Sequence, residues 1–148
     1  MSPSFLQDFS RPLLFAHRGY SAKAPENTIA AFKLAWESGI PGVELDVHLC
    51  KSGEMVVFHD DDLERITGTA GTVESTDLET LKSLDAGNGE RIPLLSEVFE
   101  AAPEHAYFDI EMKVAYRNGR ELSLEAAKLI KEQLLPFFLL LSILPGWL

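Results

Sequence analysis

The sequence predicts an α/β fold with parallel strands, and two observations indicate it. Short apolar stretches that read as strands alternate along the chain with amphipathic stretches that read as helices. Strands separated by helices usually pair in parallel, because the helix returns the chain to the edge of the sheet where the first strand began. The length of 148 residues and the apolar share of 46% are those of a single globular domain with a real core.

Four predicted strands are short and apolar, and they cover residues 13–16, 43–49, 55–58 and 107–113. Four predicted helices cover residues 28–38, 78–84, 97–101 and 124–135. Each helix follows a side chain that can accept a free backbone N–H, namely Asn27, Asp77, Ser96 and Ser123. Gly39 is expected to end the first helix in a left-handed conformation. Residues 51–54 form a predicted turn, and residues 67–76 form a predicted loop rich in Gly and Thr.

Charged side chains end or interrupt four of these apolar segments, which read Leu14-Phe15-Ala16-His17-Arg18-Gly19, Val43-Glu44-Leu45-Asp46-Val47, Val56-Val57-Phe58-His59-Asp60 and Phe108-Asp109-Ile110-Glu111-Met112-Lys113. Side chains on a strand alternate between its two faces, so Glu44 and Asp46 share a face. Glu111 interrupts another strand in the same way, and His17 and His59 end two more. Carboxylates from separate strands, together with two imidazoles, indicate a metal-assisted acid–base site.

The overall charge and the single cysteine restrict the possible partners and compartment. A formal net charge of −10 without a visible basic patch argues against nucleic-acid binding. Cys50 stands alone, so no intramolecular disulfide can form and a reducing compartment is allowed. Residues 1–11 lack the apolar core of a secretory signal, and the apolar run 134–148 is too short to span a bilayer. We therefore expect a cytoplasmic protein without a transmembrane segment.

Five short motifs carry a specific resemblance: His17-Arg18-Gly19, Pro25-Glu26-Asn27-Thr28, Glu44-Leu45-Asp46-Val47, His59-Asp60 and Glu111-Met112-Lys113. With these motifs in this order, the chain resembles the N-terminal half of a glycerophosphodiester phosphodiesterase. The resemblance covers roughly residues 12–113 and ends after about residue 133. It implies a TIM-type (β/α)₈ barrel with its chemistry at the carboxyl ends of the strands.

The chain is too short for a complete barrel, which typically needs about 250 residues. We therefore expect residues 1–148 to form one incomplete domain with about the first four strands, and residues 136–148 to be an atypical hydrophobic tail. Truncation is the preferred explanation, and the alternative is a native short variant with its own hydrophobic C-terminal cap. An open half-barrel would expose sheet edges and apolar surface, so we expect self-association.

The resemblance implies one divalent cation held by Glu44, Asp46 and Glu111. Their hard oxygen ligands suit both Mg²⁺ and Ca²⁺, and the residue types do not separate the two ions. Three buried carboxylates without a cation would repel one another and take up protons. Asp109 shares the face of Glu111 one pleat deeper, and we expect it to lie behind the ligands.

The resemblance also implies that His17 and His59 transfer protons, with His17 as base and His59 as acid, although the two could exchange roles. His48 belongs to none of the motifs, so we interpret it as structural or peripheral, and we expect His105 to face solvent.

Three further side chains are expected to bind substrate: Arg18, Lys113 and Glu26. Gly19 lets the backbone turn so that Arg18 can reach a phosphate in bidentate fashion. Lys113 shares the face of Glu111 and could neutralise charge that develops on phosphorus. Glu26 precedes the first predicted helix, and only the resemblance places it near the site.

The leading hypothesis is a metal-dependent phosphodiesterase that hydrolyses glycerophosphodiesters to an alcohol and glycerol 3-phosphate. A second hypothesis is a non-catalytic half-barrel that keeps the metal ligands. A third is a related phospholipase-D-like barrel acting on lysolipid or sphingomyelin head groups, which the missing secretory signal and disulfides disfavour. The alcohol group, the choice between Mg²⁺ and Ca²⁺ and the oligomeric state do not follow from the sequence.

Overall fold

The computed structural model describes residues 12–114, 124, 125, 128 and 138–145, and it contains an α/β fold as the sequence predicts. The strands of this part of the chain are β1 (Phe15–His17), β2 (Gly42–Leu49), β3 (Met55–Val57), β4 (Tyr107–Val114) and β5 (Phe138–Pro145). The helices are α1 (Ile29–Glu37), α2 (Glu64–Thr67), α3 (Leu78–Ser83) and α4 (Leu95–Ala101). None of these helices is long and apolar enough to cross a bilayer.

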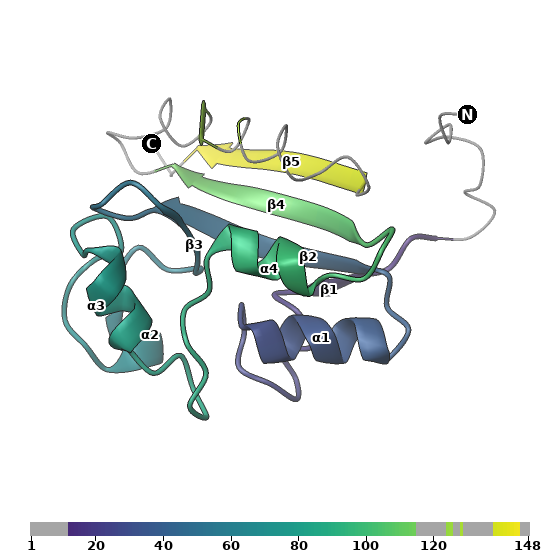
Figure 1. Cartoon of the computed structure of the whole chain (residues 1–148), viewed down its shortest axis with the longest axis horizontal. Helices are drawn as coiled ribbons and strands as arrows, with labels where there is room; N and C mark the ends of the chain where they lie inside the picture. Colours follow the sequence, from purple (N-terminus) through teal and green to yellow (C-terminus); the bar gives the residue numbers. More distant parts are fainter. Residues whose placement is uncertain (1–11, 115–123, 126–127, 129–137, 146–148) are drawn as a thin grey trace.

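The sheet is mixed rather than purely parallel. Its strand order is β1-β2-β4-β5 with parallel neighbours, and β3 pairs antiparallel with β2 (Figure 1). The prediction of parallel pairing was therefore wrong for β3. The physical reason is the short turn after Cys50, where Gly53 adopts a φ of +97° and its N–H bonds to the Cys50 carbonyl. A turn of this length closes a hairpin, whereas a parallel pair needs a crossover.

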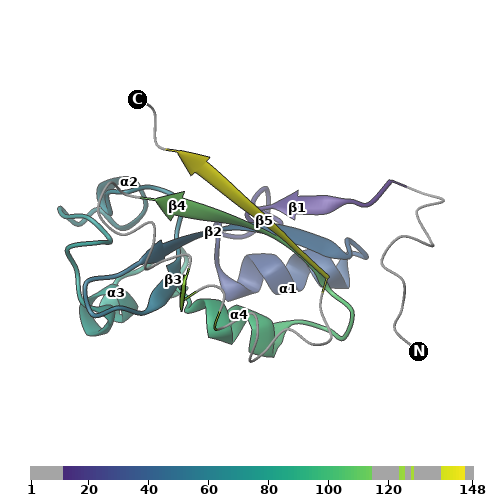
Figure 2. The ribbon, with the colours of Figure 1, turned by 90° about the horizontal axis from the view of Figure 1, so that it is seen from above.

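A fifth strand lies within the segment that the sequence analysis set apart as a hydrophobic tail. Residues 138–145 form β5, whose backbone runs parallel to β4 in register from Tyr107↔Phe138 to Val114↔Pro145 (Figure 2). The four predicted strands are all present, and β5 is added to them. The described part of the sheet is therefore wider than the prediction of about four strands. Of the predicted helix 124–135, the structure describes Leu124, Glu125 and Lys128, which are helical, and the remainder lies outside the described residues.

The two faces of the sheet differ as the alternating sequence predicts. One face carries fully buried apolar side chains, including Val43 and Leu45 on β2 and Phe108 and Ile110 on β4. Helices α1 and α4 cover this face (Figures 1 and 2). Phe99 of α4 meets Phe108 edge-on, with ring centroids 5.1 Å apart. Apolar burial against the helices therefore fixes the register, and it places the charged side chains on the opposite face.

The helix caps correct two sequence predictions. Thr28, not Asn27, is the N-cap of α1, and its Oγ1 accepts the N–H of Ala31 at 3.2 Å. Helix α4 begins after Leu94, whose N–H is satisfied by the side chain of Glu97 at 2.7 Å. Ser96 consequently lies inside the first turn of α4 instead of capping it. Other polar side chains thus satisfy these helix starts, which leaves the Asn27 side chain free for the site described below.

A second apolar cluster beyond β3 supports α2, which the sequence analysis did not predict. Phe58, Leu63, Val73 and Ile92 are among its buried members. Helix α2 ends at Gly68, which has a φ of +68°, and the predicted Gly- and Thr-rich loop follows. This cluster fixes the four-residue helix α2 beside the polar face of the sheet, where its Arg65 reaches the site.

Candidate active site

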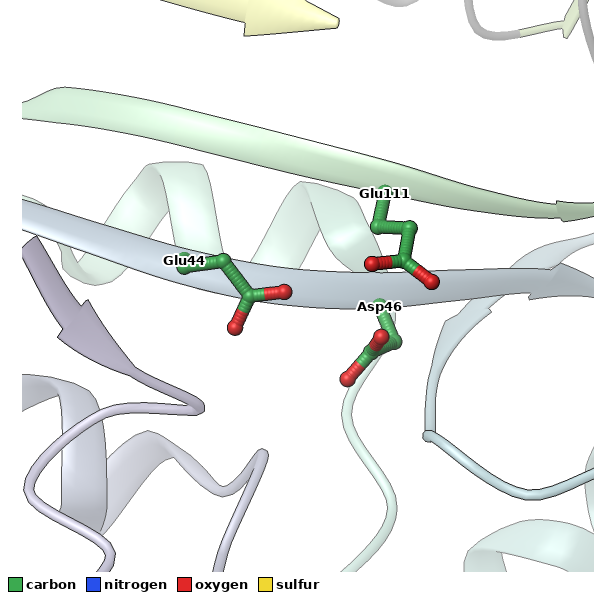
Figure 3. A group of neighbouring side chains, drawn as sticks. All are labelled: Glu44, Asp46 and Glu111. Carbon is green, nitrogen blue, oxygen red and sulfur yellow. The ribbon is translucent and has the colours of Figure 1, made fainter. Parts of the chain in front are cut away.

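Three carboxylates converge on the polar face of the sheet. Glu44 and Asp46 come from β2 and Glu111 comes from β4, and one ligand atom from each lies within 4.8 Å of the others (Figure 3). The register explains the grouping, because Asp46 lies directly opposite Glu111 on the neighbouring parallel strand. Asp46 is the deepest of the three, with 1% of its side chain exposed. The structure thus brings together the three residues expected to hold a metal.

Burial and mutual repulsion shift the proton affinity of this cluster. Burial, followed by the charge of Asp46, raises the pKa of Glu44 to about 7. The backbone N–H of Arg18 donates to Glu44 Oε2 at 3.0 Å and opposes this shift. Burial and the charge of Glu111 also raise the pKa of Asp109, which lies in register with Glu44 outside the converging group. Crowded hard oxygen ligands that repel one another fit a divalent cation such as Mg²⁺ or Ca²⁺.

Lys113 extends over the same cluster from the end of β4. Its Nζ lies 3.0 Å from Asp46 Oδ1 and also pairs with Glu111 Oε1. Burial alone would lower the pKa of Lys113, but the hydrogen bonds to Glu111 and Asp46 outweigh it and raise the pKa. The ammonium group therefore keeps its charge at neutral pH, as a phosphate-binding group requires.

Arg18 reaches the cluster because the backbone turns sharply after β1. Arg18 and Gly19 have φ values of +56° and +78°, and the Arg18 N–H bonds to the Glu44 carbonyl at 3.0 Å. Its Nε lies 3.5 Å from Asp46 Oδ2, and its Nη1 donates to Glu26 Oε1 at 3.1 Å. The turn that the sequence analysis attributed to Gly19 is thus present, and it brings Arg18 to the carboxylate cluster, where its guanidinium also contacts Glu26.

The two histidines expected to be catalytic follow different strands and have different side-chain partners. His17 ends β1 opposite Glu44 in the register, with Nε2 3.7 Å from Glu44 Oε2 and 69% of its side chain exposed. His59 follows β3, and its Nδ1 lies 2.6 Å from Asp60 Oδ1. The preceding residue, Phe58, anchors this segment by donating its N–H to the carbonyl of Asp46 at 3.0 Å. Strands β1 and β3 both pair with the edge of β2 that faces away from β4, so β2 lies between β4 and the strands that lead to the two histidines.

The remaining two histidines lie where the sequence analysis expected them. His48 is buried, and its Nε2 lies 3.2 Å from the backbone oxygen of His59. Burial lowers the pKa of His48, which is consistent with a neutral structural ring that supports the His59 segment. His105 is exposed and lies 3.7 Å from the carboxylate of Glu104.

Sequence reasoning missed three residues that contact this site. Asn27 donates from Nδ2 to Asp46 Oδ2 at 2.9 Å, although we expected it to cap a helix. Asp60 belongs to the His59-Asp60 motif, which by itself predicted no role for the carboxylate, and Arg65 lies outside all five motifs. Arg65 Nε donates to Asp60 Oδ2 at 2.5 Å and its Nη2 donates to Glu26 Oε1 at 2.8 Å. The place of Asn27 directly after Glu26 in one of the motifs could have indicated a role in the site. No local feature of the sequence distinguishes Arg65 from an arginine that only faces solvent.

The Glycerophosphoryl diester phosphodiesterase family matches residues 17–138 of the chain. The chain belongs to this family. It is 46% identical over 129 residues to a glycerophosphodiester phosphodiesterase of Caldanaerobacter subterraneus subsp. tengcongensis. The matched region covers 80% of this chain and 53% of that protein. The family resemblance inferred from the five motifs is therefore confirmed, and this chain spans about half the length of the curated relatives it matches.

Solved structures of the family have the same fold over the matched part. The crystal structure of a glycerophosphodiester phosphodiesterase from Thermotoga maritima superposes with a TM-score of 0.78 and 37% identity, covering 90% of this chain and 54% of that one. A phosphodiesterase of Oleispira antarctica, solved in complex with the product sn-glycerol-3-phosphate, gives a TM-score of 0.82 and 36% identity, covering 89% of this chain and 57% of that one.

Proposed function

We propose that this chain carries the site of a metal-dependent phosphodiesterase that hydrolyses glycerophosphodiesters to an alcohol and glycerol 3-phosphate. The observation that carries the proposal is the convergence of Glu44, Asp46 and Glu111 beside the cationic groups of Lys113 and Arg18. Few ligands match both features, and a phosphodiester held through a divalent cation is one of them. Family membership and the product complex of the Oleispira relative support the same class of substrate.

In this proposal, Glu44, Asp46 and Glu111 hold one divalent cation, either Mg²⁺ or Ca²⁺. When bound, the cation supplies Lewis acidity and a template for the phosphate oxygens. Arg18 binds a phosphate oxygen through its guanidinium, and Glu26 fixes the orientation of that guanidinium through the 3.1 Å hydrogen bond. Lys113 stabilises negative charge that develops on the phosphoryl oxygens.

The proton transfers are assigned to the two histidines. His17 removes the proton from the attacking hydroxyl, whose oxygen forms a new bond to phosphorus. The bond between phosphorus and the alcohol oxygen breaks, and His59 protonates the departing alkoxide. Because Asp60 holds Nδ1 of His59, Nε2 is the ring nitrogen left to exchange a proton with substrate. The family resemblance suggests a neighbouring glycerol hydroxyl as the first nucleophile, with a cyclic phosphate that water then opens.

The experiment is to assay this chain for hydrolysis of glycerophosphocholine, with and without added Mg²⁺ or Ca²⁺. Release of choline that requires the cation and is lost in Asp46→Asn supports the proposal. Exposed Glu104, changed to Gln, provides the control for loss of one carboxylate. Cation binding without any hydrolysis would reject the catalytic proposal and support the second hypothesis, a half-barrel that keeps its ligands without turnover.

We also propose that the sheet represents part of a (β/α)₈ barrel and that the isolated chain associates with itself. In the described part of the chain, β1 and β5 occupy the ends of the strand order. Strand edges of this kind favour pairing with another chain. Light scattering over a range of protein concentrations tests this proposal, and a constant monomer mass would contradict it.

A further inference from the structure

Arg65 of α2 makes two bidentate contacts at once, although 47% of its side chain is exposed. Its Nε and Nη2 donate to Asp60 Oδ2 and Oδ1 at 2.5 and 3.0 Å. Its Nη2 and Nη1 donate to Glu26 Oε1 and Oε2 at 2.8 and 3.3 Å. The planar guanidinium is therefore shared by two carboxylates from different loops, a geometry that a lysine cannot reproduce.

Both carboxylates use the same oxygens to hold a residue of the proposed site. Asp60 Oδ1 lies 2.6 Å from Nδ1 of His59, and Glu26 Oε1 accepts Nη1 of Arg18 at 3.1 Å. The contacts form one continuous chain, which runs His59, Asp60, Arg65, Glu26 and Arg18. It joins the loop after β3 to the turn after β1, and these loops carry the proposed acid and a proposed phosphate ligand.

The ionised state of Asp60 determines which atom donates in its contact with His59. The hydrogen bond to Arg65 is the largest cause of a pKa of about 2 for Asp60, so its carboxylate is ionised at neutral pH. An ionised carboxylate only accepts hydrogen bonds, hence Nδ1 of His59 carries the proton in their 2.6 Å contact. With the proton fixed on Nδ1, Nε2 is the nitrogen that exchanges a proton with substrate. A carboxylate that accepts from the other ring nitrogen usually has this effect on a functional histidine.

Stability alone does not explain this arrangement well. Exposed ion pairs generally contribute about 0–1 kcal/mol, because solvent screens them and the side chains lose entropy. We propose that Arg65 is a positioning residue, which orients His59 through Asp60 and Arg18 through Glu26. The role rests on the proposed function, since it assigns work to the proposed acid and phosphate ligand.

The first test observes the His59 ring directly by NMR of the chain labelled with ¹⁵N-histidine, with its signal assigned by His59→Gln. In a series of pH values, the neutral form of the wild-type ring should be the Nδ1–H tautomer, so that Nε2 is the nitrogen that gains the proton in the acid form and gives it up. Arg65→Gln should convert the neutral form to a mixture of tautomers, and Arg65→Lys should restore the Nδ1–H form only in part. Arg91→Gln is the matched control, because Arg91 is also exposed and donates to the backbone carbonyls of Ser83 and Leu84.

The second test asks whether Glu26 affects His59 through Arg65. Glu26→Gln should perturb the His59 ring signals in the presence of Arg65 and should have no effect on them in the Arg65→Gln background. If Arg65→Gln does not fold, as judged by circular dichroism, the same comparison is made in the Arg65→Lys background, where the effect of Glu26→Gln should be reduced.

A kinetic test separates the effects of these residues on kcat from their effects on KM. Asp60→Asn should lower kcat, Glu26→Gln should raise KM, and Arg65→Gln should do both, each by about 10- to 100-fold, the usual range for groups that orient a functional side chain. Unchanged His59 signals in Arg65→Gln, or equal changes in Arg91→Gln, would overturn the positioning role. A chain without hydrolytic activity but with the expected NMR changes would overturn the proposed function and leave the coupling intact.

Discussion

Asn27 donates a side-chain hydrogen bond to Asp46 Oδ2 over 2.9 Å, and only 3% of Asn27 is exposed. Asn27 holds a left-handed φ of +56°, a conformation that Asn tolerates better than most residues. Its N–H bonds to the carbonyl of Arg18 at 3.0 Å, so the same residue ties the turn after β1 to the buried carboxylate. The amide therefore fixes the direction of the most deeply buried of the three proposed metal ligands.

Replacing Asn27 by Asp should destabilise the metal-free protein by about 1–3 kcal/mol, because a buried donor to Asp46 becomes an acceptor with like charge. Added divalent cation should recover part of this loss, since it binds the folded state and offsets the extra carboxylate. Chemical denaturation with and without Mg²⁺ or Ca²⁺ measures both effects.

Asn88→Asp is the control for this substitution. Asn88 also has a left-handed φ, of +53°, but it is exposed in the loop before Arg91. We expect its replacement to change stability by less than about 0.5 kcal/mol, as for most surface substitutions. Equal effects of the two Asp variants would show that the bond to Asp46 contributes nothing specific.

Gly19→Ala should destabilise the protein and displace Arg18 from the site. A Cβ at Gly19 would lie 2.7 Å from the backbone carbon of Ala31, and the φ of +78° is itself unfavourable for alanine. The left-handed conformation costs about 1–2 kcal/mol and the overlap adds about 1–3 kcal/mol. Urea denaturation provides the measurement, with Gly53→Ala beside it. Gly53 has a φ of +97° and no atom within 4 Å of an added Cβ, so it should show the conformational cost alone.

The proposed metal ligands should differ from the neighbouring Asp109 in their effect on cation binding. Glu44→Gln, Asp46→Asn and Glu111→Gln should each weaken Mg²⁺ or Ca²⁺ binding at least tenfold, about 1.4 kcal/mol, in calorimetric titrations. Asp109→Asn should leave the affinity nearly unchanged, because Asp109 shares the face but does not belong to the converging group. Chelation should abolish any hydrolysis. Normal cation binding in the Asp46 and Glu44 variants would remove the assignment.

The polar face of β2 and β4 was predictable because it depends only on the alternation of side chains along each strand and on the burial of the apolar ones. Val43 and Leu45 must face the helices, so Glu44 and Asp46 must face away from them, and the parallel register then places Glu111 beside Asp46. What the sequence could not provide was the geometry of the loops. The contacts of Arg65, for example, depend on where the second apolar cluster fixes α2. Local sequence preferences do not determine such long-range placement. The antiparallel pairing of β3, by contrast, follows from the predicted turn 51–54, which is too short for a crossover.

Asp60 should contribute to acid stability in a defined range. Its folded pKa of about 2 lies below its ordinary value of 3.8, so the stabilisation is fully present above pH 4 and is lost as the pH falls toward 2. Asp60→Asn should therefore be less stable than wild type at neutral pH, and this difference should shrink between pH 4 and pH 2. Denaturation curves at several pH values measure it. Asp77→Asn serves as control, since Asp77 pairs only with exposed Lys51 at 3.2 Å among the contacts described.

The proposed acid and base predict strong and coupled losses of activity. His17→Ala and His59→Ala should each lower turnover of glycerophosphocholine by about 10²-fold or more, the usual contribution of a general acid or base. The double variant should be less than multiplicatively worse, because the two groups act in one reaction. His105→Ala is the control, since this exposed ring contacts Glu104 and none of the proposed site residues. If either single variant keeps near wild-type turnover while its cation affinity is unchanged, that histidine supports the fold and its catalytic assignment fails. Because His17 is far more exposed than His59, its replacement should also cost less stability, which separates a chemical loss from a folding loss.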